Sequence, residues 1–332
     1  MINQSPVLLL IMAAVLNGTP LLFGTVGEIL SEKSGNLNLG VEGMMYMGGA
    51  MGLGAAFYYE QLSGGSASGI VAVLLAILFS FLGGAFGALI YSFITITLRA
   101  NQNVTGLALA IFGTGAGQFI GEYMRVTSGG YVAISNELKA VFANSPFPAA
   151  LQKLPVVGPL LFGQNIFVYL GLAVAVVMAV FLNRSRAGLY LRAVGESPAT
   201  ADAAGINVTR NKYLATCVGA GISGLGGLYY TMDYIKGTWA NDGTIESLGW
   251  LAVALVIFAT WRSVNAIWGS YLFGLLFWVY LIIPGLGRRD TYLFNMLPYL
   301  VTIAVLIFVS LRNKKENQPP ASLGLAYFRE ER

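Results

Sequence analysis

The residue types that most often do chemistry in proteins are almost missing from this sequence. There is no histidine, which excludes histidine proton relays, HExxH metal sites and Ser-His-Asp triads. The single cysteine, Cys217, lies in an apolar run, which excludes disulfide scaffolds and cysteine-based metal sites. No Gly-Lys dipeptide occurs, so the chain has no Walker A loop. We therefore expect no catalytic residue, no bound metal and no cofactor in this chain.

One glycine pattern, over Gly219–Gly224, matches the dinucleotide-binding fingerprint GxGxxG. That fingerprint binds a pyrophosphate only where a strand leads into an open helix N-terminus. Here it lies in the middle of an apolar run, so we interpret it as a helix-packing face. The pairs Gly48/Gly52 and Gly83/Gly87 show the same small-residue spacing, which lets membrane helices approach each other closely.

The elements that position the few polar residues must be membrane helices, because the chain is too apolar for a soluble fold. Of 332 residues, 56% are hydrophobic and only 10% are charged, whereas soluble domains carry about 25% charged residues. So few charges cannot cover the surface of a globule of this size in water. Composition thus excludes a soluble enzyme, a disordered chain and a nucleic-acid-binding protein. The net charge of +4 fits basic cytoplasmic loops better than a phosphate-bearing partner.

Charged residues divide the chain into long intervals that carry no charge. Backbone polar groups cannot stay unpaired in lipid, so each interval long enough to cross the hydrocarbon layer predicts a helix. We expect an all-α, polytopic integral membrane protein with about nine transmembrane helices, the alternatives being eight or ten. The intervals are Met1–Gly27, Gly43–Tyr59, Gln61–Leu98, Ala100–Gly121, Leu154–Asn183, Tyr213–Met232, Ser247–Trp261, Ser263–Gly287 and Thr291–Leu311.

The distribution of Lys and Arg predicts the orientation of the chain in the membrane. With nine crossings, most of these residues fall on one side, above all in the loop Arg184–Lys212 and in the C-terminal tail. Positive charge marks the cytoplasmic side, so we expect the N-terminus outside and the C-terminus inside. We expect the polar tail, which contains Pro319-Pro320, to be disordered or to lie on the membrane surface. The predicted parts are a transmembrane domain over 1–312, with an external loop over 122–153 and a cytoplasmic loop over 184–212, and a cytoplasmic tail over 313–332.

The cytoplasmic loop contains a pattern that is typical of a short helix with defined ends. Ser197 suits an N-cap and Pro198 suits the first helical position. Alanines follow, and Gly205 suits the position just after a helix end. Such a helix has only small side chains, so its own apolar bulk cannot anchor it. We infer that it sits in a groove of another protein, although an ordinary connecting turn fits the same residues.

Two segments resemble permease subunits of ABC importers. The run GESPATADAAGIN over Gly195–Asn207 is similar to the coupling-loop signature of the branched-chain amino acid/ribose type. The run GEILSEKSGNLNLGVEGMM over Gly27–Met45 looks like a narrower signature of nucleoside and simple-sugar importers, with Lys33 where Arg is commoner. Those importers use a basic-membrane-lipoprotein-type binding protein. The resemblance extends from about Leu8 to Leu311.

The resemblance implies a type II-like ABC importer permease fold and a division of tasks between subunits. This chain would be a transport subunit and not an enzyme, because ATP and Mg²⁺ would bind to a partner ATPase. A second, related permease, a substrate-binding lipoprotein and membrane lipid would be its other partners, and nucleic acid would not. The ATPase-coupling residues that the resemblance implies are Gly195, Glu196, Ser197, Pro198, Ala199, Ala201, Ala203, Ala204, Gly205 and Ile206.

The N-terminal run favours a nucleoside as cargo, with a simple sugar such as ribose or galactose as the alternative in the same machinery. A stand-alone secondary transporter is the weaker alternative, because the charged residues lie at interval edges and not near the middle of a span. Amides beside the second span could hydrogen-bond a ribose or a base, although capping of a helix start explains them equally well. The candidate pathway residues are Asn36, Asn38, Gly40, Glu42 and Gln118.

Overall fold

The computed structural model of the chain is helical. In the described part, regular structure consists of helices, and the one β-type contact is an isolated bridge between Ala133 and Thr238. The predicted all-α class is therefore confirmed. The described residues are 6–64, 66–155, 157–239, 244–283, 285, 288–312 and 318–329.

The helices fall into two length classes. The longer ones are α1 (Pro6–Lys33), α2 (Val41–Leu62), α3 (Gly69–Ser92), α4 (Gln102–Thr127), α7 (Ile166–Arg184) and α10 (Val208–Tyr229). Wide π-turns continue α3 over Phe93–Thr97 and α10 over Tyr230–Tyr234. The shorter ones are α5 (Asn136–Ala143), α6 (Ala149–Gln152), α8 (Arg186–Glu196), α9 (Pro198–Ala203), α11 (Thr244–Phe258), α12 (Ser263–Trp278), α13 (Arg288–Asn295) and α14 (Leu297–Arg312).

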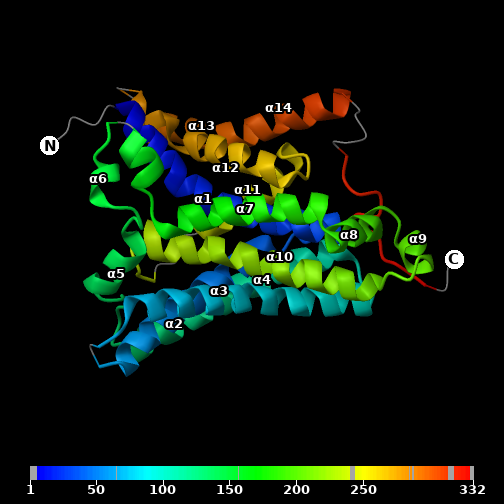
Figure 1. The fold of residues 1–332 in the computed structure, drawn as a ribbon, viewed down its shortest axis with the longest axis horizontal. Helices are drawn as coiled ribbons and strands as arrows, with labels where there is room; N and C mark the ends of the chain where they lie inside the picture. The colour runs from blue at the N-terminus through cyan, green and yellow to red at the C-terminus, as the bar shows by residue number, and fades with distance from the viewer. Residues whose placement is uncertain are drawn as a thin grey trace.

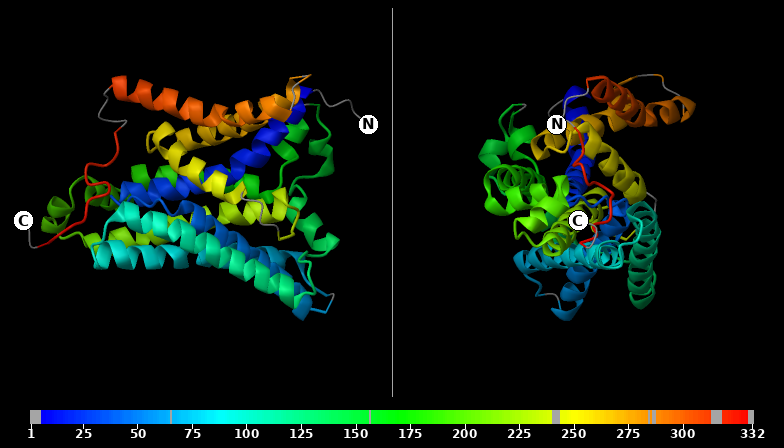
Figure 2. Two further views of the ribbon diagram at one scale, coloured as in Figure 1. Left: turned by 180° about the vertical axis from the view of Figure 1, so that it is seen from behind. Right: turned by 90° about the vertical axis from the view of Figure 1, so that its right-hand side faces the viewer.

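The long helices run lengthwise between two ends of the molecule (Figure 1). One end, called the α9 end below, carries α8, α9 and the tail residues 318–329. The opposite end, called the α5 end, carries α5, α6 and the start of α1. The reverse view in Figure 2 shows the same separation. The sequence segments over 184–212 and 318–329 therefore meet at one end, although more than a hundred residues separate them along the chain.

Apolar surface covers the sides of this bundle. Four helical segments of the described chain are long and apolar enough to cross a membrane, namely Leu8–Lys33, Gly69–Thr97, Gln102–Thr127 and Ile166–Arg184. On α3 the side chains of one face are large, apolar and exposed at helical spacing. Such a stripe is unfavourable in water and favourable against lipid tails. The structure thus has the features of a polytopic membrane protein, while the number of nine crossings stays a prediction. The stripe consists of Leu74, Leu78, Leu82, Phe86 and Leu89.

Helix α10 lies at the centre and packs against α1, α2 and α3 through its glycines. A Cβ atom on Gly219 would lie 2.4 Å from the carbonyl oxygen of Gly27 in α1, and one on Gly224 would lie 2.7 Å from that of Ser80 in α3. Only glycine lets three backbones come this close. The interpretation of the GxGxxG pattern as a packing face is therefore confirmed.

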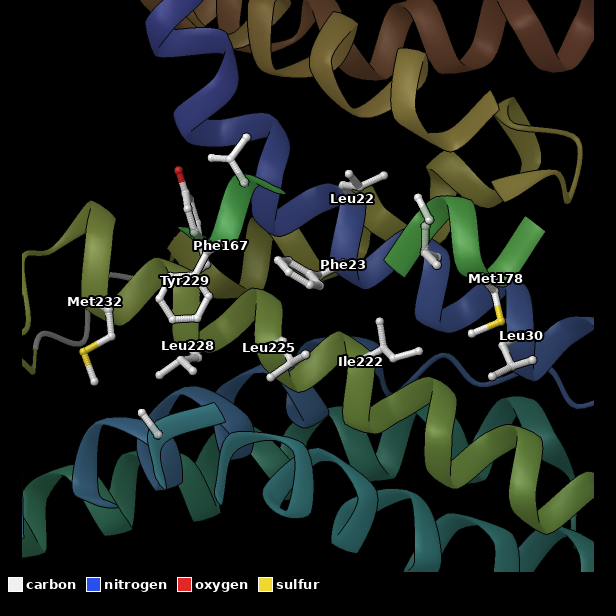
Figure 3. Packing of buried hydrophobic residues seen from close by; sticks show 14 of the residues in the cluster. Leu22, Phe23, Leu30, Phe167, Met178, Ile222, Leu225, Leu228, Tyr229 and Met232 are labelled. Carbon is white, nitrogen blue, oxygen red and sulfur yellow. The ribbon is translucent and has the colours of Figure 1, made fainter. Parts of the chain in front are cut away.

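Large apolar side chains pack together between α10, α1 and α7. Figure 3 shows Phe23 of α1 beside Leu225 of α10, and Phe167 of α7 beside Tyr229. The ring centroids of Phe167 and Tyr229 are 6.2 Å apart, in an edge-to-face arrangement that aromatic pairs prefer. This cluster fixes α1, α7 and α10 relative to one another.

A strained turn between α11 and α12 is fastened to the end of α1. Thr260 and Trp261 both have positive φ angles, 51° and 54°, which non-glycine residues rarely adopt. The indole nitrogen of Trp261 donates a hydrogen bond to the carboxylate of Glu32 in α1. This buried contact holds the turn against the α9 end of α1 and compensates for its backbone strain.

Candidate functional site

The loop between α1 and α2 is polar and yet buried at the α9 end of the bundle. Asn36 and Asn38 are 0% and 1% exposed. The amide nitrogen of Asn36 donates to the hydroxyl of Thr216 in α10 at 2.8 Å. The side-chain oxygen of Asn38 accepts from the backbone nitrogen of Gly40 at 3.0 Å. The Glu28 carboxylate accepts from the backbone nitrogen of Asn38, also at 3.0 Å.

Two neighbouring helices hold the middle of this loop through its backbone at Leu37. The hydroxyl of Tyr91 in α3 donates to the Leu37 carbonyl at 2.6 Å. The Leu37 nitrogen donates to the side-chain oxygen of Gln102 in α4 at 2.7 Å. Non-helical backbone at this depth needs such partners, because lipid and apolar side chains offer none. The structure thus brings Asn36, Asn38 and Gly40 together as parts of one fixed loop.

The other two candidate pathway residues lie on the facing sides of α2 and α4. Glu42, in the first turn of α2, accepts a hydrogen bond at 3.2 Å from the hydroxyl of Thr114 in α4. Gln118 follows Thr114 by one helical turn, so it lies on the same side of α4, where it is half-buried. The helices come close here because Gly113 contacts Gly43 backbone to backbone. These polar groups form a second, separate set from the loop amides.

The predicted short helix in the loop over 184–212 is present as α9. The Ser197 hydroxyl accepts from the nitrogen of Thr200 at 3.4 Å, Pro198 is the first helical residue, and Gly205 has a φ of 81°. The N-cap, the first helical residue and the glycine after the helix end are therefore those that the sequence predicts. A preceding helix, α8, ends at Glu196.

One side of this segment faces the bundle and the other faces outward. Gly195 is buried against α1, where a Cβ atom would lie 2.3 Å from the carbonyl oxygen of Lys33. Ala201 is buried in a small apolar cluster with Val194 and Val208. Ser197, Pro198 and Ile206 are half-buried. The remaining residues of the predicted coupling set, all exposed, are Glu196, Ala199, Ala203, Ala204 and Gly205.

The expectation that the tail is disordered or lies on the membrane is wrong for residues 318–329. The Ser322 hydroxyl donates to the carbonyl of Gly195 at 2.5 Å. The carboxylate of Asp202 in α9 accepts from the Tyr327 hydroxyl at 3.0 Å and from Arg329 at 3.1 Å. These contacts order the segment against α8 and α9. The predicted tail residues 313–317 and 330–332 lie outside the described residues.

Sequence reasoning missed the tail as part of this region. A signal was present, because Leu323, Leu325, Tyr327 and Phe328 place apolar and aromatic side chains at close spacing in an otherwise polar tail. The Arg99 guanidinium lies over the Phe328 ring at 4.9 Å from its centroid, and Tyr327 packs on the cluster around Ala201. Such residues gain little from a disordered state in water.

The tail closes one side of a cavity of about 450 Å³ at the α9 end. The side-chain oxygen of Asn36, which lines it, is buried and has no hydrogen-bond partner among the described residues. Asp202 and Gly205 also line it. Within the part of the chain that the structure describes, no group of three or more His, Cys, Asp or Glu side chains could hold a metal ion.

A family model and several known proteins match this chain. The model described as the branched-chain amino acid transport system/permease component matches residues 10–309. A Haloferax volcanii protein assigned by name to glucose ABC transport as a permease is 33% identical, over 97% of this chain and 98% of its own length. A nucleoside ABC transporter permease of Lactococcus lactis is 31% identical over 87% and 88%. A guanosine ABC transporter permease of Bacillus subtilis is 28% identical over 90% and 91%.

No solved structure matches the chain. The family match spans nearly all of the helical bundle described above, including the buried loop, α8 and α9. The relatives align over almost their full lengths, so the similarity is one of whole subunits and not of a shared fragment. The chain therefore belongs to the branched-chain amino acid transport system/permease component family and is a multi-pass membrane permease subunit of an ABC importer, not itself an enzyme.

Proposed function

We propose that this chain forms half of a membrane pathway through which nucleosides enter the cell. Similarity over 87% and 90% of the chain to permeases named for nucleoside and guanosine transport carries this proposal. A simple sugar is the second candidate cargo, favoured by the higher identity, 33%, to the relative named for glucose. Both solutes are rich in hydroxyl groups and recognisable by uncharged hydrogen bonds, so the same architecture can serve either.

The facing sides of α2 and α4 are the proposed lining of the pathway. Glu42 on α2 offers a carboxylate. Thr114 and Gln118 on α4 offer a hydroxyl and an amide, one helical turn apart. Ribose hydroxyls can donate to the carboxylate and to the amide oxygen, and base acceptors can receive from the amide nitrogen. Asn36 lines the cavity of about 450 Å³ at the α9 end, and this cavity is the proposed cytoplasmic exit of the pathway. Asn38 and Gly40 bond to each other and are proposed to shape the loop instead of contacting solute.

The exposed side of α9 is the proposed docking surface for the ATPase subunit. Ala199, Ala203 and Ala204 are small and exposed, which leaves a narrow helix ridge that fits a groove. The preceding helix, α8, is fastened to α1 through Gly195, and α9 is fastened to the tail through Asp202. Movement of the ATPase would therefore be transmitted to the bundle as a rigid displacement. ATP and Mg²⁺ would bind to that subunit.

The proposed assembly contains two ATPase subunits, a second related permease and an external substrate-binding lipoprotein. In the membrane, α1, α2, α3, α4, α7, α10, α11, α12 and α14 are the proposed nine crossings. The α9 end would face the cytoplasm and the α5 end, with the loop over 122–153, the outside. The transmembrane domain over 1–312 and the tail over 313–332 would then both end on the cytoplasmic side. The excess of Lys and Arg in the loop over 184–212 supports this orientation.

Uptake by the reconstituted complex tests the function. The chain is tagged and purified with its partners from native membranes, and the complex is placed in liposomes with ATP inside. We expect uptake of a radiolabelled nucleoside that excess unlabelled nucleoside abolishes and excess ribose or glucose leaves unchanged. No uptake of the nucleoside, together with ATP-dependent uptake of radiolabelled ribose or glucose, would replace nucleoside with sugar as cargo. Uptake that continues without ATP and without co-purified subunits would contradict the ABC mechanism and favour a secondary transporter.

A further inference from the structure

A second cavity at the α9 end, of about 580 Å³, is surrounded by positive charge. It lies where the ends of α1 and α7 meet α8 and the α11–α12 turn. Lys33, Arg192 and Arg262 line it, each from a different one of these elements. No Asp or Glu belongs to the described residues that line it. Of these, Lys33 and Arg192 repel each other across the cavity unless an anion lies between them.

Two buried polar atoms around this cavity lack a hydrogen-bond partner among the described residues. They are the Nε of Arg192 and the hydroxyl of Ser263. Ser263 is 3% exposed and is the first residue of α12. Unpaired buried donors are costly, and each can donate to an oxygen atom of a bound group. Their presence at the same cavity is independent of the charge argument and indicates the same kind of ligand.

The α12 N-terminus adds a third attraction for an anion. Its N-cap residue, Arg262, makes no side-chain hydrogen bond to the first turn, so backbone N–H groups of this 16-residue helix have no side-chain cap. The positive end of the helix dipole lies at the same place. An anionic oxygen there would accept from backbone N–H groups and from the Ser263 hydroxyl together.

The two nearby glutamates, Glu32 and Glu196, are not among the described residues that line the cavity. Glu32 is occupied by the Trp261 indole. Glu196 attracts the Lys33 ammonium, as Glu32 also does, whereas Arg192 and Arg262 repel it.

We propose that this cavity binds a phosphate group. Arginine guanidinium groups match phosphate oxygens with paired hydrogen bonds, and lysine adds a point charge. Basic pockets between membrane helices on the cytoplasmic side are also suited to anionic lipid headgroups. Apolar Leu182 and Val264, the latter 49% exposed, line the same cavity and give it an apolar border toward lipid. The phosphate therefore belongs either to an anionic phospholipid or to a soluble phosphate compound.

Occupation of this site would link α8 to α1 and to the α11–α12 turn. Arg192 lies on α8, one turn before Gly195, and α8 leads directly into α9. A phosphate held by Arg192, Lys33 and Arg262 would fix α9 relative to the bundle. The site would thus stiffen the segment that is the proposed contact with the ATPase. This inference does not depend on which solute the permease carries.

Native mass spectrometry of the full chain tests the proposal. The chain is purified in detergent, stripped of lipid and mixed with equal amounts of phosphatidylglycerol and phosphatidylcholine. We expect wild type to retain phosphatidylglycerol preferentially and the double variant R192Q/R262Q to retain it at least about tenfold less, since two charge-assisted contacts are lost. Arg186→Gln removes an exposed cation on the same helix that does not line the cavity, and should behave as wild type. A soluble ligand is tested by inorganic phosphate, which should raise the melting temperature of wild type in phosphatidylcholine nanodiscs.

Each result decides the proposal without a transport assay. Selective loss of phosphatidylglycerol from R192Q/R262Q assigns the site to a lipid headgroup, and selective loss of the phosphate effect assigns it to a soluble compound. Equal binding of both lipids by wild type, together with no response to phosphate, would overturn the proposal. If R192Q/R262Q does not fold, R192K/R262K preserves both charges. It should retain phosphatidylglycerol preferentially but less strongly than wild type, and the absence of any preference in wild type would still count against the site.

Discussion

Single polar side chains supply the hydrogen-bond partners that the loop between α1 and α2 needs inside an apolar bundle. The Glu28 carboxylate is 1% exposed and accepts the backbone N–H of Asn38. Asn38 in turn accepts from the nitrogen of Gly40. These two backbone donors of the irregular segment thus obtain acceptors that a helix would have supplied itself. The carboxylate and the amide are needed for their acceptor oxygens and not only for a role in transport.

Replacement of Glu28 separates this structural role from its charge. Glu28→Ala leaves the N–H of Asn38 without an acceptor, and we expect a loss of about 1–3 kcal/mol in stability. Glu28→Gln retains an acceptor oxygen for this N–H, so it should cost less. Thermal unfolding of the purified chain in detergent measures both.

The matched control is Glu137→Ala, which removes an exposed glutamate from α5 and should change stability by less than about 0.5 kcal/mol. Equal losses for Glu28→Ala and Glu28→Gln would show that the negative charge matters and the acceptor oxygen does not. No loss for Glu28→Ala would contradict the hydrogen-bond argument altogether.

At the scale of helices, close backbone contact between α2 and α10 determines the packing of the bundle. A Cβ atom on Gly227 would lie only 1.8 Å from the carbonyl oxygen of Met45, so Gly227→Ala must push the two helices apart. Gly115 on α4 has no atom near its Cβ position, so Gly115→Ala meets no obstacle.

We expect Gly227→Ala to lower the melting temperature and the yield of folded protein. Gly115→Ala should be neutral or stabilising by up to about 1 kcal/mol, because alanine favours a helix over glycine. Fluorescence-detected size exclusion during heating compares the two. A Gly227→Ala variant as stable as Gly115→Ala would contradict the close contact of α2 with α10.

Helix α9 is the element whose proposed role is easiest to test by added bulk. Ala203 is exposed at its end, so Ala203→Trp leaves the fold intact and fills the space into which the ATPase groove would fit. We expect ATP-driven uptake to be abolished while expression and monodispersity stay normal. Gly205→Trp should have the same effect, but its positive φ angle adds backbone strain, so it is the less specific variant.

The control for α9 is Ala187→Trp, which adds the same bulk to an exposed position on α8 outside the predicted coupling set. Uptake by this variant should stay close to that of wild type. Unchanged uptake by Ala203→Trp would show that α9 does not contact the ATPase. Loss of uptake by both variants would instead indicate that bulk anywhere on this loop is harmful.

Local elements could be predicted from the sequence, and long-range contacts could not. Ser197, Pro198 and Gly205 fix the ends of α9 through interactions within a few residues, so their pattern predicted the helix. The tail contacts α9 through Tyr327 and Asp202, which are 125 residues apart in sequence. A single sequence does not pair such residues. The polar composition of the tail predicted that it is disordered in solvent or lies on the membrane surface. A few aromatic side chains instead determine its position against α8 and α9.

The same limit explains the partial success with the pathway candidates. The amides at Asn36 and Asn38 were recognised as unusual inside an apolar chain, and they are indeed buried. The Asn36 amide bonds to Thr216, so its partner depends on where α10 passes, and that is set by glycine contacts between helices. The sequence therefore predicted the positions of polar residues and not which of them remain available to a solute.

At the scale of the whole molecule, the two ends of the bundle differ in charge and in what they carry. The α9 end combines both cavities, the tail and cations such as Arg99, Arg192 and Lys212. The α5 end carries two short helices, of which α5 is fixed by stacking of Phe142 on Phe167. Such asymmetry is what a membrane imposes, because positive loops stay in the cytoplasm. It makes the orientation of the chain a testable property of the entire molecule.

Accessibility of single cysteines to a membrane-impermeant maleimide tests this orientation in intact cells. Cys217→Ala gives a background without cysteine. Ser66→Cys is exposed in the α2–α3 turn at the α5 end, and Ala204→Cys is exposed just after α9. We expect the reagent to label Ser66→Cys in intact cells and Ala204→Cys only after permeabilisation. Detergent-solubilised protein, in which both should react, controls for reactivity. The reverse pattern would place α9 outside, where no ATPase could reach it, and would contradict both the orientation and the proposed coupling role of α9.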